Sequence, residues 1–107
     1  APIADYELLS RAVETAKRQG TNVVVGNVLS SDVFYNAMGN VNDLWRGMGV
    51  LAVEMEAAAL YMNAAKAGKK ALCMLTISDH LYTNEHLSAE DRQLGFHKMM
   101  EIALELA

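Results

Sequence analysis

Three apolar runs alternate with segments of helical periodicity, and this alternation constrains the fold more than any other feature of the chain. The runs cover residues 21–29 (TNVVVGNVL), 49–56 (GVLAVEME) and 69–80 (KKALCMLTISDH). They are too apolar to face water on one side, which is typical of strands buried on both faces of a parallel sheet. Strands that alternate with helices predict an α/β fold whose largely parallel sheet is covered by helices on both faces.

The segments between and around these runs have the stop and start signals of helices. Gly20 and Gly68 are typical helix terminators, and Ser88 with Asp91 three residues later predicts an N-terminal cap. We therefore expect helices over 4–19, 42–47, 57–68 and from 89 to the end.

Composition narrows the class of protein. The 107 residues fit one domain, and the 52% hydrophobic content is enough for a packed core. A net charge of −4 without a basic stripe argues against a nucleic-acid partner. A single cysteine, Cys73, suits a reducing compartment, and no apolar run approaches the roughly 20 residues that span a bilayer. We expect a soluble, cytoplasmic domain with no membrane partner.

Two glutamates, Glu54 and Glu56, flank one methionine at the end of the second apolar run. On an extended chain, residues two apart point to the same side, so the two carboxylates would share one face. A carboxylate accepts hydrogen bonds through two oxygens and suits the two neighbouring hydroxyls of a ribose. The alternative is that Glu56 only begins a helix, where acidic residues are favoured. Both interpretations remain open from spacing alone.

Asp79 and Arg92 are the next candidates. Ligands of parallel sheets bind beyond the carboxyl ends of the strands, and Asp79 lies at the end of the third run. It either caps the following turn or serves as an acid. Arg92 lies in the first turn of the last predicted helix, where the dipole disfavours a cation. It is either a solvated surface residue or a partner that reaches Asp79.

The remaining sequence patterns say less about function. Phe34 either packs in the core or stacks on a flat heterocycle. His80, Glu85 and His86 match no recognised metal-ligand spacing, so no metal site is expected. The glycines do not form G-x-G-x-x-G, so a dinucleotide is not supported.

Taken together, four motifs resemble bacterial purine nucleoside phosphorylases of the hexameric, broad-specificity type: VEMEAAALY, TISDH, AEDRQ and the upstream SSDVFY. VEMEAAA is similar throughout the wider superfamily, which includes nucleosidases and uridine phosphorylase. The SDH triplet, followed by the arginine of DRQ, is more discriminating. The resemblance implies a three-layer α/β/α phosphorylase-like fold with a mostly parallel or mixed sheet. It further implies that residues 1–107 are the C-terminal part, about half, of a single nucleoside phosphorylase domain.

The resemblance also implies roles for single residues. Asp79 would be the general acid at purine N7, and Arg92 would assist that proton transfer. Glu56 would hold the ribose hydroxyls, Met55 would pack on the sugar and Phe34 would lie against the purine. The complete set of substrate-binding residues implied is Phe34, Val53, Glu54, Met55, Glu56 and Ser78.

The activity implied is phosphate-dependent cleavage of purine (deoxy)ribonucleosides, as in purine salvage, by a homohexamer that uses phosphate as co-substrate and no cofactor. By the same resemblance, the phosphate-binding groups lie in the other half of the domain. The isolated chain is therefore expected to be inactive. A related nucleosidase that uses water, and a truncated domain that only binds a nucleoside or assembles with other subunits, remain the alternatives.

Overall fold

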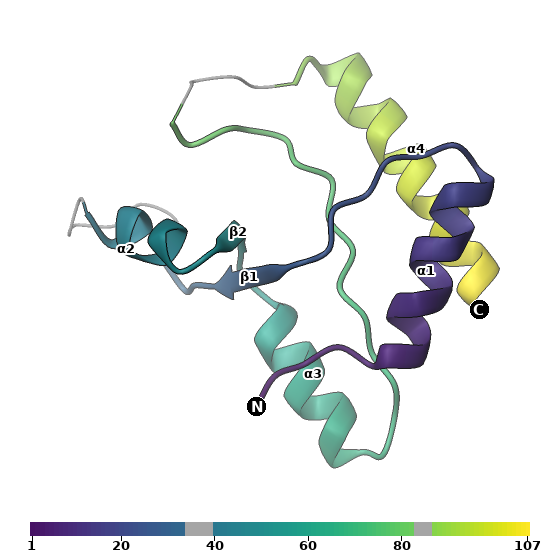
Figure 1. The fold of residues 1–107 in the computed structure, drawn as a ribbon, viewed down its shortest axis with the longest axis horizontal. Coiled ribbons are helices and arrows are strands. Elements are labelled where there is room, and N and C mark those ends of the chain that lie inside the picture. Colours follow the sequence, from purple (N-terminus) through teal and green to yellow (C-terminus); the bar gives the residue numbers. More distant parts are fainter. Residues whose placement is uncertain (34–39, 83–86) are drawn as a thin grey trace. The chain divides into compact units, whose positions relative to one another are not determined.

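A computed structural model describes residues 1–33, 40–82 and 87–107 (Figure 1). Helices and strands follow in the order α1 (Tyr6–Arg18), β1 (Asn27–Ser30), α2 (Val41–Gly47), β2 (Val50–Glu54), α3 (Ala57–Lys66) and α4 (Ala89–Leu106). The strands are parallel and separated by a helix, so the predicted α/β class is confirmed. The chain forms two compact units, Ala1–Ala4 with Val24–Ala71 and Asp5–Val23 with Leu72–Ala107.

The first unit is built on the pairing of β1 with β2, which lie side by side in Figure 1. Their register places Ser30 opposite Glu54, and the backbone N–H of Ser31 continues the pairing by donating to the Glu54 carbonyl at 2.9 Å. Gly26 precedes β1 where the Leu51 side chain crosses it so closely that a Cβ would overlap Leu51. The carboxyl ends of both strands therefore meet at one edge, directly before α3.

The helix ends that glycine predicts are confirmed by their hydrogen bonds. Gly68 has a φ of 67°, and the N–H groups of Gly68 and Lys69 return to the carbonyls of Ala65 and Ala64 at 3.2 and 2.8 Å. This double closure is a Schellman motif, which needs a left-handed residue that glycine adopts without strain. The same motif ends α1 at Gly20, whose φ is 70°.

The second unit packs α1 against α4. Its buried core is formed by Ala12, Ala16 and Ile102, with Leu72, Met74 and Leu106 partly buried against it. Small alanines on α1 let the two helices approach closely. The predicted cap of α4 is confirmed, because the N–H of Asp91 donates to the Ser88 hydroxyl at 3.1 Å.

Two strands predicted from the sequence differ in the structure. The first, predicted over 21–29, is paired only over Asn27–Ser30, and Val24 before it is 83% exposed. In the third, predicted over 69–80, residues 69–78 form no strand ladder with the described residues, and an isolated bridge forms at Asp79. Its two-residue alternation persists, with Met74, Thr76 and Ser78 partly buried and Leu75 and Ile77 exposed. Buried strands require neighbouring strands, and the described residues supply a ladder of two.

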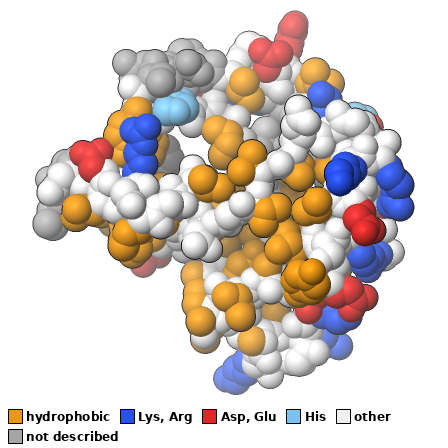
Figure 2. Space-filling model, in the orientation of Figure 1, with side chains coloured by type: hydrophobic (Ala, Val, Ile, Leu, Met, Phe, Trp, Pro, Cys, Tyr) orange, Lys and Arg blue, Asp and Glu red, His pale blue; other side chains and the backbone are white. Residues whose placement is uncertain are grey.

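Apolar side chains reach the surface in many places (Figure 2). They include Val24, which precedes the paired part of the first predicted strand, Ile77 in the third predicted strand, and Leu104 in α4. Within the described ranges, none of the helices is long and apolar enough to cross a membrane.

Candidate active site

The junction between β2 and α3 carries the first group of candidate residues. Glu54 ends β2, Met55 and Glu56 form the connection, and Ala57 begins α3. A strand that runs directly into a helix through two residues holds its last side chain over the first turn of that helix. This is the local reason why the two carboxylates, which share one face on an extended chain, have different surroundings here.

The carboxylate of Glu54 is held by donors of the protein. Its Oε2 accepts from the backbone N–H groups of Glu56 and Ala57 at 2.6 and 2.7 Å, and its Oε1 accepts from the hydroxyl of Ser30. The same Ser30 oxygen accepts from the N–H of Ala58 at 2.9 Å. The sequence analysis did not single out Ser30, because its partner is 24 residues away and only the register of β1 on β2 reveals the contact.

These hydrogen bonds set the charge state of Glu54. Burial raises the pKa of its carboxyl, but the hydrogen bonds from Ser30 and from the backbone N–H groups of Glu56, Ala57 and Met55 outweigh burial, so the pKa lies below its ordinary value. Donors that stabilise the ionised form lower a carboxyl pKa. Glu54 is therefore an anion at neutral pH, and it lies at the positive end of α3.

Glu56 occupies the N-cap position of α3, yet its side chain makes no capping hydrogen bond. The residue is exposed. The interpretation that Glu56 begins a helix is thus confirmed for its backbone, while its carboxylate is left uncommitted among the described residues. Such a carboxylate can still accept hydrogen bonds from a ligand.

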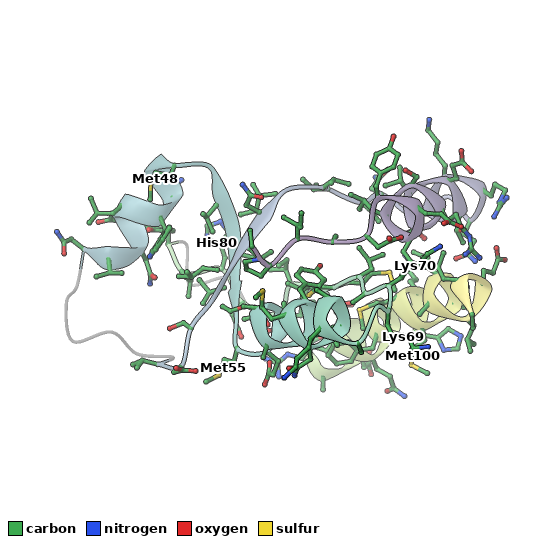
Figure 3. All side chains as sticks on the ribbon, turned by 90° about the horizontal axis from the view of Figure 1, so that it is seen from below. Met48, Met55, Lys69, Lys70, His80 and Met100 are labelled. Carbon is green, nitrogen blue, oxygen red and sulfur yellow. The ribbon has the colours of Figure 1, made fainter. Side chains whose placement is uncertain are left out.

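The apolar candidates surround this junction. Figure 3 labels Met55 where β2 passes into α3, and its side chain is 44% exposed. Val53 is also partly exposed. Phe34 lies outside the residues that the structure describes, so its predicted contact with a purine stays a prediction.

The second group of candidates lies in the second unit. The Ser78 hydroxyl donates to Asp79 Oδ2 at 3.0 Å, and Arg92 Nη2 lies 3.8 Å from Asp79 Oδ1. Both side chains of this ion pair are about half exposed, at 43% for Arg92 and 50% for Asp79. The N–H of Leu87 donates to the Ser78 carbonyl at 2.8 Å and ties the start of α4 to the candidate acid.

Arg92 keeps further hydrogen-bonding capacity. Its Nε is buried and has no partner among the described residues, and its backbone N–H donates to the Ser88 carbonyl at 3.0 Å. The cation in the first turn of α4 thus faces Asp79, as one of the two sequence interpretations predicts. The carboxylate of Asp79 thus lies between the hydroxyl of Ser78 and the guanidinium of Arg92.

The structure therefore assembles two sets, one in each unit. Ser30, Glu54 and Glu56 meet at the end of the parallel strands, and Ser78, Asp79 and Arg92 meet before α4. Across the described ranges, no group of three or more His, Cys, Asp or Glu side chains could hold a metal ion. Ligands of parallel α/β sheets bind beyond the carboxyl ends of the strands, and Ser30, Glu54 and Glu56 lie at that edge of the β1–β2 pair.

Comparison with known proteins defines the family. The family model of the Phosphorylase superfamily matches residues 1–106, so the chain belongs to the Phosphorylase superfamily. It is 50% identical over 107 residues to the protein named purine nucleoside phosphorylase DeoD-type from Clostridium novyi (strain NT) and covers 46% of that relative. It is 52% identical over 104 residues, 97% of this chain, to the protein of the same name from Bacillus subtilis (strain 168), of which it covers 44%. The chain thus spans about half the length of these relatives, and the resemblance predicted from the four motifs is confirmed.

Proposed function

We propose that this chain is part of a purine nucleoside phosphorylase, which cleaves the glycosidic bond of purine (deoxy)ribonucleosides with phosphate to give the free base and (deoxy)ribose 1-phosphate. The observation that carries the proposal is the identity of about half of all positions, over essentially the whole chain, with relatives of that name. The uncommitted carboxylate of Glu56 at the strand ends supports it.

In this proposal the junction of β2 and α3 binds the sugar. Glu56 accepts hydrogen bonds from the ribose hydroxyls, because its carboxylate is exposed and makes no capping contact. Met55 and Val53 supply apolar contacts beside it, and their partly exposed side chains are available for this. Glu54 lines the same region, with its oxygens already bonded to protein donors.

The second set acts on the base. Phosphate attacks the sugar C1′ while the bond from C1′ to purine N9 breaks, and the electron pair of that bond passes to the purine. Asp79 donates a proton to N7 and so neutralises the leaving group. Arg92 then pairs with the carboxylate that remains, which favours the release of the proton toward the base. Ser78 holds Asp79 by its hydrogen bond of 3.0 Å, and Phe34 lies against the purine.

Phosphate is the co-substrate in this proposal, and no cofactor takes part. Within these 107 residues, the basic residue that we assign to the reaction is Arg92, and its role is to pair with Asp79 and not to bind phosphate. The groups that bind phosphate belong to the remainder of the full-length protein, since the relatives are about twice as long. We further propose that the full-length protein is a cytoplasmic homohexamer of purine salvage, with this chain as the C-terminal part of its domain.

The test is base release from inosine and adenosine by the full-length protein that contains these residues, with and without phosphate. We expect release to require phosphate and to yield one sugar 1-phosphate for each base. Release at the same rate without phosphate would assign the chain to a nucleosidase that uses water. Binding of nucleoside without any release would leave a binding or assembly role and overturn the proposal.

A further inference from the structure

The first turn of α3 is capped by residues that are not its own N-cap residue. A helix begins with N–H groups that have no partner within the helix, and the side chain at the N-cap position usually accepts one of them. In α3 that position holds Glu56, which makes no such bond. Glu54 accepts from the N–H groups of Glu56 and Ala57, and Ser30 accepts from that of Ala58.

Ser30 links the elements of this arrangement. Its hydroxyl donates to Glu54 at the end of β2 and accepts from Ala58 in α3, while its own backbone belongs to β1. One hydroxyl therefore ties two strands to one helix. Glu54 Oε2 is bonded to the two successive N–H groups that flank the Cα of Glu56, at 2.6 and 2.7 Å. These contacts hold the backbone of the residue that carries the uncommitted carboxylate.

We propose that Ser30 and Glu54 are positioning residues that take over the capping of α3, so that the carboxylate of Glu56 is fixed in place and remains available to the ribose hydroxyls. This inference rests on the proposed function, which supplies the ribose. Without Ser30, Glu54 loses the donor to Oε1 and the N–H of Ala58 loses its acceptor. Because Glu56 holds the N-cap position, its carboxylate can then turn to the unpaired N–H groups of that turn, and a carboxylate that caps the helix is no longer available to a sugar.

The argument predicts a defect confined to ligands that carry the sugar hydroxyls. In the full-length protein, Ser30→Ala should raise the KM for inosine about tenfold, the size expected for one lost hydrogen bond to a charged group, with a smaller change in kcat. The inhibition constant of 2′,3′-dideoxyinosine, which lacks both hydroxyls, should stay unchanged. Ser30→Thr keeps the hydroxyl and should restore the wild-type KM.

Two further variants separate positioning from general damage. If Ser30 acts through Glu56, then Ser30→Ala combined with Glu56→Gln should bind inosine no more weakly than Glu56→Gln alone, because residues in one network are not additive. Ser10→Ala removes the same hydroxyl from a serine of α1 that takes no part in this network, and it should change neither constant. Equal losses for inosine and dideoxyinosine, or no rescue by Ser30→Thr, would overturn the inference.

Amide hydrogen exchange provides a readout that does not depend on turnover. Ser30→Ala should speed exchange at the Ala58 N–H by at least tenfold, while the amide of Ala65 near the other end of α3 should not change. Unchanged exchange at Ala58 would overturn the inference even in an active enzyme. An inactive wild-type protein would instead count against the proposed function alone, because the exchange measurement would still judge the capping by Ser30 and Glu54.

Discussion

The two candidate sets differ in how firmly their charged groups are held. At the junction of β2 and α3, Glu54 accepts backbone N–H groups at 2.6 and 2.7 Å, in the range of strong charge-assisted hydrogen bonds. Before α4, the ion pair of Asp79 with Arg92 is 3.8 Å long, and both of its side chains are about half exposed. The carboxylate of Glu54 is therefore held firmly by the protein's own donors, whereas the pair of Asp79 with Arg92 is held loosely.

This difference suits the two tasks in the proposed reaction. Hydroxyls that keep their positions through the reaction are best held by groups that do not move, because orientation is then achieved in advance. A proton donor must change its charge during the reaction, and catalytic contacts are often long before substrate binds. Removal of a residue should accordingly affect different kinetic constants in the two sets. It should mainly lower kcat for the residues before α4 and mainly raise KM for those at the junction.

The largest effect is expected at Asp79. In the full-length protein, Asp79→Asn removes the proton donor, and we expect kcat to fall by about 10²–10⁴-fold, with the greatest loss for 6-amino purine nucleosides. Steady-state kinetics on adenosine and inosine measures this. Asp91→Asn, a matched change in the first turn of α4, should leave kcat within about twofold. Equal rates for Asp79→Asn and wild type on both substrates would remove Asp79 from the mechanism.

The next effect is expected at Arg92. Arg92→Ala removes the cation that lies 3.8 Å from Asp79, and if the proposed mechanism holds, kcat should fall roughly tenfold to a hundredfold. Arg18 is the matched control, because its ion pair with Glu105 is shorter, at 3.2 Å, but exposed on the α1–α4 surface. Arg18→Ala should leave kcat unchanged and cost at most about 1 kcal/mol of stability. Similar kinetic losses in the two variants would abolish the contrast between them.

A smaller effect is expected from the strand pair that carries the junction. Gly26→Ala places a Cβ against Leu51, and overpacking of this kind costs about 1–3 kcal/mol in the free energy of unfolding. Leu51→Ala should relieve the overlap, so the double variant should be more stable than the two single losses predict. Chemical denaturation of the full-length protein measures both. Gly47→Ala, where a Cβ would meet nothing within 4 Å, is the control.

The smallest effect concerns the stability of the junction at low pH. The pKa of Glu54 lies below its ordinary 4.5, because hydrogen bonds to the anion outweigh the rise due to burial. A carboxyl with a lowered pKa stabilises the folded state above its ordinary pKa, and that contribution is lost as the pH falls through the lowered value. The protection factor of the Ala57 amide, which compares its exchange rate with the intrinsic rate at the same pH, should therefore fall on acidification below about pH 4.5. Glu54→Gln should flatten this dependence, and an unchanged profile in that variant would assign the effect to another carboxyl.

Helices were predictable because their signals are local. Gly20, Gly68 and the Ser88 cap each act within a few residues, and the observed helix ends fall at or within two residues of the predicted ones. The connection from Glu54 to Glu56 was likewise recognisable, since two carboxylates at the end of an apolar run stand out from their neighbours.

Strand pairing and the role of Ser30 depend on contacts between distant residues. Residues 69–78 have the composition and alternation of a strand, but a strand also needs a neighbour, which the described residues do not provide. Ser30 is one of two adjacent serines, and nothing in the sequence distinguishes it from Ser31. Only the parallel register places Ser30, and not Ser31, opposite Glu54.

The split origin of the α3 cap has a consequence for protein design. The segment VEMEAAA is continuous in sequence, but the N–H of Ala58 is satisfied by a hydroxyl from another strand, 28 residues upstream. A designer who transplants these seven residues onto a different scaffold would carry over both carboxylates and leave that donor without its acceptor. The unit that must be transferred is the pair of adjacent parallel strands with a serine at the end of the first strand. The sequence motif alone lacks the acceptor for the Ala58 N–H.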